Sequence, residues 1–284
     1  MNDIEAIARL DEIFLSKEWI GQDEDRYAYN CLCALLQNVS NEQKDLLIEL
    51  TERYKWIALR EYTSMLLNAF DQVECDKLEN IKRIILFPIH DPKDEDRTKS
   101  GNFVLYMLKS CSMITKLRYS LSKYNGIYFQ EIETFDDLYK ESFSFNNSEL
   151  IFLIDDFLGS GETLDATLKA IYRDKFISKS IVNIIAVASQ LDSIDYCIKN
   201  QLPFYTECIE GKAITDHYNS EDAQKNKDLM EDIERLIPKN KHKFGYNQSE
   251  AIITLLRTPN NTFPIFWKPH KKNQQLFYPP FPRD

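Results

Sequence analysis

The chain has 284 residues, and its 45 acidic residues against 35 Lys and Arg residues give a formal net charge of −10 at pH 7. This length can bury one large core or one core with a small domain, and the negative charge disfavours nucleic-acid binding through charge alone. Six scattered cysteines predict neither a zinc site nor a disulfide framework, and no segment is long and apolar enough to span a bilayer. Because the N-terminal sequence also lacks the pattern of a signal peptide, we expect a cytoplasmic protein without a membrane partner.

Residues 1–78 are predicted to form a helical region. Ser40 with Gln43 three residues later is a capping box for a helix that begins there. Apolar residues recur at helical spacing, at Leu10, Ile13, Phe14, Leu32, Leu35 and Leu36. Since such an apolar stripe has to be covered, this region is expected either to cap the domain that follows or to dock a partner protein. We favour docking or hooding.

A buried strand is predicted at residues 83–89, and a charged loop follows it. This loop ends in Lys99, Ser100 and Gly101 at the predicted start of a helix. Backbone N–H groups and a cation at such a place can bind an anion. The alternative is an ordinary exposed connection closed by a Ser-Gly cap.

The most informative pattern lies at residues 149–163, where an uninterrupted apolar run is followed by Asp155 and Asp156. The loop after these acids contains Gly159, Ser160, Gly161, Glu162 and Thr163. Its glycines and hydroxyls close on a helix N-terminus, which predicts a phosphate-binding loop. Glu162 stands where a nucleoside triphosphate loop needs a lysine, so we expect a ribose 5-phosphate whose hydroxyls face the two acids. The alternative is a Gly-rich turn with surface acids.

Strands and helices alternate along the rest of the chain. Further strands are predicted at residues 126–130, 180–188 and 204–209, and helices at residues 163–172 and 194–200. This alternation predicts an α/β fold with a parallel sheet of about five strands flanked by helices, after an N-terminal helical region. Ligands of such sheets bind at the carboxyl ends of the strands, where both candidate anion loops fall. The expected division is a helical region at 1–78, a core at 79–258 and a C-terminal hood or tail at 259–284.

The segment from Asp155 to Thr163 resembles the phosphoribosyl pyrophosphate (PRPP) motif of type I phosphoribosyltransferases. In that motif a hydrophobic run is followed by two acids, three variable residues, Thr or Ser, Gly, any residue and Thr. Ser160 fills the position of the first hydroxyl residue. The loop that ends at Gly101 matches the pyrophosphate loop of these enzymes in place, although it is longer and more acidic than theirs.

Other features make the chain similar to a particular group within that family. The helical leader, the Lys-Ser-Gly loop and the ending at residues 258–267 resemble phosphoribosyltransferase-like effectors of bacterial conflict systems, with the resemblance covering about residues 80–267. Such proteins occur beside anti-phage partners such as retron or ATPase components. The resemblance therefore implies a role in antiviral defence and a protein partner from the same system.

The resemblance also implies roles for individual residues. Asp155 and Asp156 would be the catalytic pair, Lys99 to Gly101 would hold pyrophosphate, and Trp267 could stack on a nucleobase, with core or interface filling as the alternative for Trp267. The implied cofactor is Mg²⁺ bound together with PRPP, without a metal site built by the protein alone. Three functions remain open: a phosphoribosyltransferase with an unidentified acceptor, a non-catalytic PRPP or nucleotide sensor that regulates a multiprotein complex, and a structural subunit with a vestigial pocket.

Overall fold

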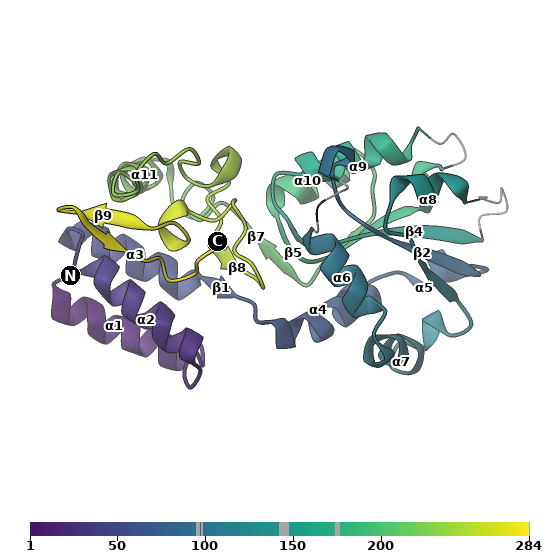
Figure 1. Ribbon diagram of the computed structural model, residues 1–284, viewed down its shortest axis with the longest axis horizontal. Coiled ribbons are helices and arrows are strands. Elements are labelled where there is room, and N and C mark those ends of the chain that lie inside the picture. Colours follow the sequence, from purple (N-terminus) through teal and green to yellow (C-terminus); the bar gives the residue numbers. More distant parts are fainter. Residues whose placement is uncertain (95–96, 98, 142–147, 174–176, 284) are drawn as a thin grey trace. The chain divides into compact units, whose positions relative to one another are not determined.

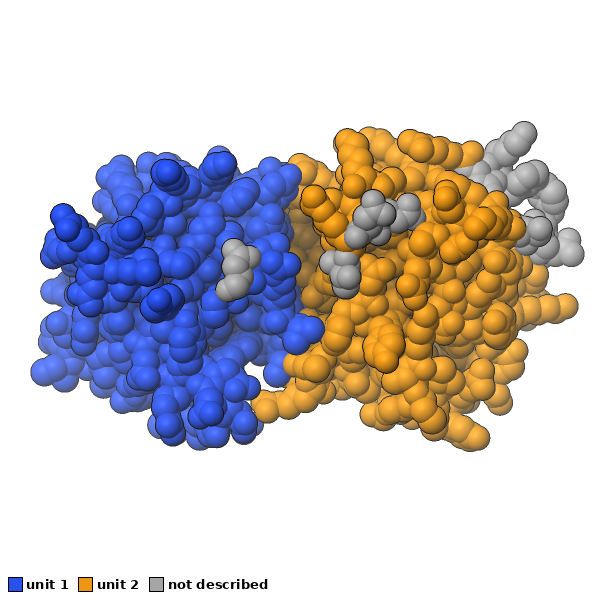
Figure 2. All heavy atoms as spheres, in the orientation of Figure 1, with its two compact units in different colours: residues 1–58, 211–284 blue, residues 59–210 orange. Residues whose placement is uncertain are grey.

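The computed structural model describes residues 1–94, 97, 99–141, 148–173 and 177–283. The chain divides into two compact units (Figures 1 and 2). Unit 1 combines residues 1–58 with residues 211–284, and unit 2 consists of residues 59–210. Within the described part of the chain, no helix has both the length and the apolar character needed to cross a membrane.

Unit 2 is built around a parallel sheet with the strand order β3-β2-β4-β5-β6, in which β7 also pairs with β5. The strands are β2 (Arg83–Pro88), β3 (Tyr128–Glu131), β4 (Glu149–Leu158), β5 (Val182–Gln190), β6 (Phe204–Tyr205) and β7 (Cys208–Glu210). The predicted parallel α/β sheet is confirmed. It has six strands because the segment expected to form one strand at 204–209 forms both β6 and β7.

Helices flank this sheet, and Figure 1 shows α8, α9 and α10 above it and α4, α6 and α7 below it. Their bounds are α4 (Leu59–Asp71), α5 (Cys75–Leu78), α6 (Ser100–Leu108), α7 (Cys111–Tyr119), α8 (Phe135–Lys140), α9 (Glu162–Ile171) and α10 (Leu191–Lys199). Every residue of β5 is buried, as expected for a parallel strand covered on both faces. The predicted helices at 163–172 and 194–200 correspond to α9 and α10.

Unit 1 is mainly helical and is assembled from the two ends of the chain. Its elements are α1 (Asp3–Ser16), α2 (Asp23–Leu36), α3 (Asn41–Arg53), β1 (Lys55–Trp56), α11 (Ser220–Glu234), β8 (Ile253–Thr254), β9 (His270–Lys272) and β10 (Gln275–Phe277). The predicted capping box is present at the start of α3, where Ser40 and Gln43 each accept the backbone N–H of the other. Strand β1 pairs in parallel with β8, and α3 packs against both α1 and α11.

The apolar stripe of the N-terminal helices is buried in the core of unit 1. All six stripe residues, Leu10, Ile13, Phe14, Leu32, Leu35 and Leu36, are at most 4 % exposed. The same core contains aromatic residues from the C-terminal part of the chain, and the ring of Phe281 stacks on the ring of Tyr54 with their centroids 4.6 Å apart. The cover that this stripe requires therefore comes from within unit 1.

The compact units differ from the predicted division at residues 78/79 and 258/259. Residues 59–78 belong to unit 2 because α4 packs against β5 of the sheet. Residues 259–284 belong to unit 1, where Phe263, Phe266 and Phe281 are buried in the core. Both differences arise from packing between segments that are distant in sequence.

We expect Phe281→Ala to lower the free energy of unfolding of unit 1 by about 3–5 kcal/mol, because it removes a buried ring from between Tyr54 and Trp56. All three tryptophans, Trp19, Trp56 and Trp267, lie in unit 1, so tryptophan fluorescence during urea unfolding reports on this unit. Tyr278→Ala is the control, since Tyr278 is 61 % exposed and its loss should change little. Equal unfolding midpoints for Phe281→Ala and the wild type would contradict the role given to the C-terminal segment.

Candidate functional site

Asp155 and Asp156 lie near the carboxyl end of β4 and are only 7 % and 8 % exposed. Strands β2 and β4 run in parallel, with Pro88 opposite Ile154, so the chain leaves β2 beside the two acids. This edge of the sheet is where ligands of parallel α/β proteins bind. The structure thus brings the two predicted anion loops, which are more than fifty residues apart in the chain, to the same edge of unit 2.

Hydrogen bonds from three directions hold the two carboxylates. The hydroxyl of Ser100, at the start of α6, donates to Oδ1 of Asp155 at 2.6 Å. The backbone N–H of Asp156 donates to the same oxygen at 2.8 Å, and the hydroxyl of Tyr62 on α4 donates to Oδ2 of Asp156 at 3.4 Å. These contacts restrict the side-chain rotamers of both acids, so the carboxylates are positioned before any ligand arrives.

The electrostatic surroundings of this pair are unfavourable for two negative charges. Burial, reinforced by the neighbouring charge of Asp156, raises the pKa of Asp155 well above its usual range, and burial also raises the pKa of Asp156. No Lys or Arg among the described residues forms an ion pair with either carboxylate. A ligand that brings hydroxyl donors or a cation would therefore stabilise the charged form of the pair.

Gly101 allows α6 to approach the sheet closely enough for the Ser100 contact. A Cβ atom at this position would lie 2.9 Å from the carbonyl oxygen of Ile154 and 3.1 Å from the backbone nitrogen of Ile89. Both distances are shorter than ordinary van der Waals contact, and both involve backbone atoms that cannot rotate away. A glycine at this position is therefore required by packing against the ends of β2 and β4.

The loop between β4 and α9 has the geometry of an anion site. Gly161 is the N-cap of α9 and has φ +79°, a conformation that favours glycine. The hydroxyl of Ser193 on α10 donates to the carbonyl oxygen of Gly159 at 2.7 Å and fixes the loop from outside. The hydroxyls of Ser160 and Thr163 make no hydrogen bond to any described residue, and Thr163 is exposed. Together with the first N–H groups of α9, they can donate to a phosphate.

Lys99 is engaged by an acid of its own loop. Its ammonium group forms an ion pair with Asp94 at 2.8 Å, and Arg97 pairs with the same carboxylate at 3.2 Å. These cations lower the pKa of Asp94 below its usual value, chiefly through the hydrogen bond from Lys99. Residues 95, 96 and 98 of this loop lie outside the described residues. A pyrophosphate group would have to compete with Asp94 for Lys99.

The remaining predicted site residue, Trp267, lies in unit 1 and is 6 % exposed. Its indole N–H donates to the carbonyl oxygen of Thr262 at 2.8 Å. The ammonium nitrogen of Lys268 lies 4.7 Å from the ring centroid, and the guanidinium carbon of Arg283 lies 5.7 Å from it. These contacts account for Trp267 within the packing of unit 1, and its stacking on a nucleobase stays a prediction.

Two side chains at this site, Tyr62 and Ser193, are not part of any sequence pattern. Tyr62 reaches Asp156 across 94 residues of sequence from a helix that was predicted to belong to a separate region. Ser193 lies 34 residues beyond the loop that it fixes. Neither contact follows a fixed spacing, so no local signal could have identified these residues.

The carboxylate oxygens of Asp155 and Asp156 could hold a cation such as Mg²⁺ only if a bound ligand supplied further oxygen atoms. Among the described residues, no group of three or more His, Cys, Asp or Glu side chains could hold a metal ion. Mg²⁺ is commonly held by one or two carboxylates together with the phosphates of a substrate, and Asp155 and Asp156 supply that number. A magnesium ion bound together with PRPP therefore stays a prediction that these residues fit.

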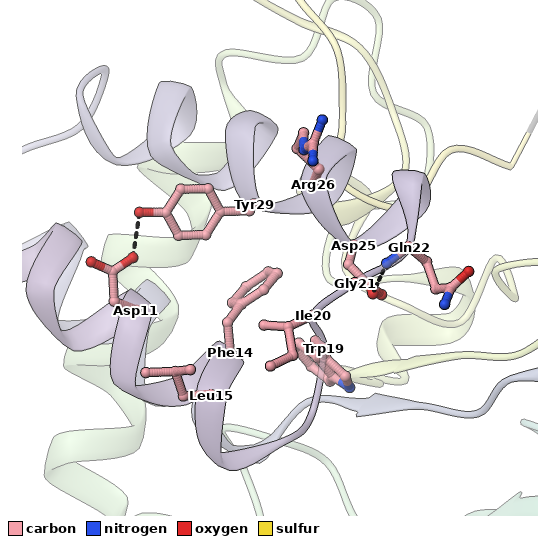
Figure 3. Close-up of a pocket in the computed structure, with 10 residues that line it drawn as sticks. All are labelled: Asp11, Phe14, Leu15, Trp19, Ile20, Gly21, Gln22, Asp25, Arg26 and Tyr29. Carbon is pink, nitrogen blue, oxygen red and sulfur yellow. Dashed lines mark hydrogen bonds between the residues drawn. The ribbon is translucent and has the colours of Figure 1, made fainter.

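A concave feature in unit 1 contains none of the predicted site residues. It is a pocket of about 400 Å³ between α1 and α2 (Figure 3). The lining residues are Asp11, Phe14, Leu15, Trp19, Ile20, Gly21, Gln22, Asp25, Arg26 and Tyr29. The hydroxyl of Tyr29 donates to Asp11 at 2.5 Å across one side of it. This pocket lacks the loop with two glycines that characterises the site in unit 2.

Comparison with known proteins adds one finding. A family model described as PRTase-CE matches residues 17–283 of the chain. This match spans parts of both compact units and includes every predicted site residue. No curated protein matches the chain.

Gly101→Ala should destabilise unit 2 by about 1–3 kcal/mol, because the added methyl group forces α6 away from β2 and β4. Far-UV circular dichroism during thermal unfolding measures this loss, and tryptophan fluorescence should change little because unit 2 contains no tryptophan. Ser112→Ala, an exposed position in the first turn of α7, is the control. An unchanged unfolding midpoint in Gly101→Ala would show that the close approach is not needed.

The raised pKa of Asp155 predicts a pH-dependent effect of Asp155→Asn on stability. A carboxyl group whose pKa is raised by folding stabilises the folded state only at low pH, and this contribution is lost as the pH rises through the pKa of the folded state. Asp155→Asn should therefore raise the unfolding midpoint at about pH 8, and the gain should disappear toward about pH 4. Asp136→Asn, at an exposed position, is the control for the loss of one negative charge. If the increase in unfolding midpoint caused by Asp155→Asn became larger toward low pH, the raised pKa of Asp155 would be contradicted.

Proposed function

The chain belongs to the PRTase-CE family, and we propose that unit 2 of this phosphoribosyltransferase-like protein binds PRPP or a ribose 5-phosphate nucleotide. One observation carries this proposal: two buried acids lie at the carboxyl end of β4, next to the N-terminus of α9, where two hydroxyls have no hydrogen-bond partner among the described residues. Each carboxylate can accept hydrogen bonds beyond those that it receives from the protein, and the two hydroxyls can donate to an acceptor. A ribose 5-phosphate supplies both in one molecule.

The proposed binding mode assigns each end of the ligand to one part of the site. The 5-phosphate accepts hydrogen bonds from Ser160, Thr163 and the first N–H groups of α9. The ribose hydroxyls donate to Asp155 and Asp156, whose carboxylates are already oriented by Ser100 and Tyr62. Binding then favours the ionised form of both acids, which burial alone disfavours.

If the protein is catalytic, the reaction is transfer of a phosphoribosyl group. The bond between C1 of the ribose and the pyrophosphate oxygen breaks, a bond from C1 to the acceptor forms, and the acceptor releases a proton. Asp155 and Asp156 would hold the ribose in position for this displacement, so that most of the rate enhancement comes from orientation and electrostatics. Mg²⁺, when bound with PRPP, would neutralise charge on the leaving pyrophosphate.

A second candidate function, a PRPP or nucleotide sensor without turnover, is favoured by the loop before α6. In this loop Lys99 is held by Asp94 rather than being available to pyrophosphate. Such a sensor would bind ligand through the 159–163 loop and regulate a partner. In either case, we place the protein in a bacterial anti-phage defence system with a protein partner, on the strength of the resemblance to conflict-system effectors.

The double variant Ser160→Val with Thr163→Val should bind PRPP in the presence of Mg²⁺ far more weakly than the wild type. Each lost hydrogen bond to the charged phosphate should cost about 1.5–3 kcal/mol, so titration calorimetry should detect little binding. Thr115→Val, at an exposed position on α7, is the matched control and should keep wild-type affinity. Equal affinities in all three proteins would remove the phosphate-loop assignment.

Turnover separates the two candidate functions. Pyrophosphate release from PRPP by the wild type, lost in Asp155→Asn with Asp156→Asn, supports the transferase. Tight binding without release supports the sensor. If the same double variant keeps wild-type activity in a phage-restriction assay, this site does not perform the defence function.

A further inference from the structure

One stretch of unit 2 carries basic residues without acidic ones. Residues 97–130 contain six Lys and Arg residues and no Asp or Glu, although the chain as a whole has 45 acidic residues. This stretch contains α6, α7 and β3 of unit 2. Residues 251–283 of unit 1 likewise contain five Lys and Arg residues and no Asp or Glu, so the net charge of −10 is an average over acidic and basic stretches in both units. Since charges beyond about 10 Å are largely screened at physiological ionic strength, a local basic surface keeps its own potential.

Two of these cations are available for binding, and both lie on α7. Four of the six already pair with acids: Arg97 and Lys99 with Asp94, Lys109 with Glu133, and Lys123 with Asp71. Lys116 and Arg118 are exposed, and neither forms an ion pair with any described residue. Side chains two residues apart on a helix project roughly 160° from each other, so these two cations lie at opposite edges of the exposed face, and each can bind an external anion.

The rest of the exposed face of α7 carries an aromatic side chain and several hydroxyl groups. Met113 and Leu117 are buried and anchor the opposite face of the helix, so the orientation of α7 is fixed. Tyr119 at its C-terminus is 85 % exposed, the most exposed tyrosine among the described residues. Exposed hydroxyl residues on and beside the helix are Ser112, Thr115 and Ser120. An aromatic ring that remains in water next to two cations and several hydroxyls has little role in folding.

We propose that the exposed face of α7, formed by Ser112, Thr115, Lys116, Arg118, Tyr119 and Ser120, binds single-stranded nucleic acid. Lys116 and Arg118 contact phosphates, the hydroxyls donate to phosphate oxygens, and the ring of Tyr119 stacks on an unpaired base. Stacking requires an accessible base face, which a duplex does not offer. Tyr106 on α6, which packs against α7, is 75 % exposed and is a second stacking surface for the same strand.

The test uses the full chain and a short fluorescein-labelled oligouridine, with binding followed by fluorescence anisotropy at low salt. Lys116→Glu with Arg118→Glu should weaken binding by about ten-fold or more. It should also reduce the slope of log affinity against log salt concentration by the amount expected for the loss of about two phosphate contacts. Tyr119→Ala should weaken binding by about 5- to 100-fold with little change in the salt dependence. Together, these two responses would support contacts to both phosphate and base.

The matched control is Lys239→Glu with Lys241→Glu, two exposed cations of unit 1 with the same spacing and the same change in net charge. This control should keep wild-type affinity for the oligouridine, and all variants should keep the circular dichroism spectrum of the folded protein. Equal loss of affinity in both double variants would overturn the proposal in favour of a general charge effect. Absence of oligouridine binding would also overturn it, as would equally tight binding of polyglutamate, which would indicate an acidic protein partner.

Discussion

The site in unit 2 depends on one close approach, that of the N-terminus of α6 to the ends of β2 and β4. Parallel pairing of these strands brings both loops to one edge of the sheet, and Gly101 leaves the space that the helix needs. Only then can Ser100 donate to Asp155. The helix, the two strands and the acid therefore meet at this one point.

The two acids show a conflict between stability and binding. Placing adjacent carboxylates in a buried position without a cation costs free energy, as their raised pKa values indicate. A fold selected only for stability would have amides or apolar residues there. Retaining the acids is consistent with a ligand that compensates their charge, and the hydrogen bonds from Ser100 and Tyr62 reduce the reorganisation that such binding requires.

Unit 1 shows how the ends of the chain can form one core. The N-terminal helices supply an aliphatic stripe, and the C-terminal segment supplies aromatic rings that pack among Tyr54, Trp56 and Trp19. Neither segment could bury its apolar surface alone. In the order of the chain, unit 2 is therefore inserted between the two segments that form unit 1. The family match, which covers residues 17–283, includes parts of both units.

The sequence by itself determined the alternating strands and helices of the α/β sheet, the 159–163 segment at the N-terminus of α9 and the capping box of α3, because each of these patterns is written in residues that are close together in the chain. Only the tertiary structure decided the boundaries of the two units, the contact of Tyr62 with Asp156 and the contact of Ser193 with Gly159. These features depend on which surfaces meet after folding. Apolar periodicity shows that a helix must be covered, but the free energy of burial is non-directional, so it does not specify which segment provides the cover.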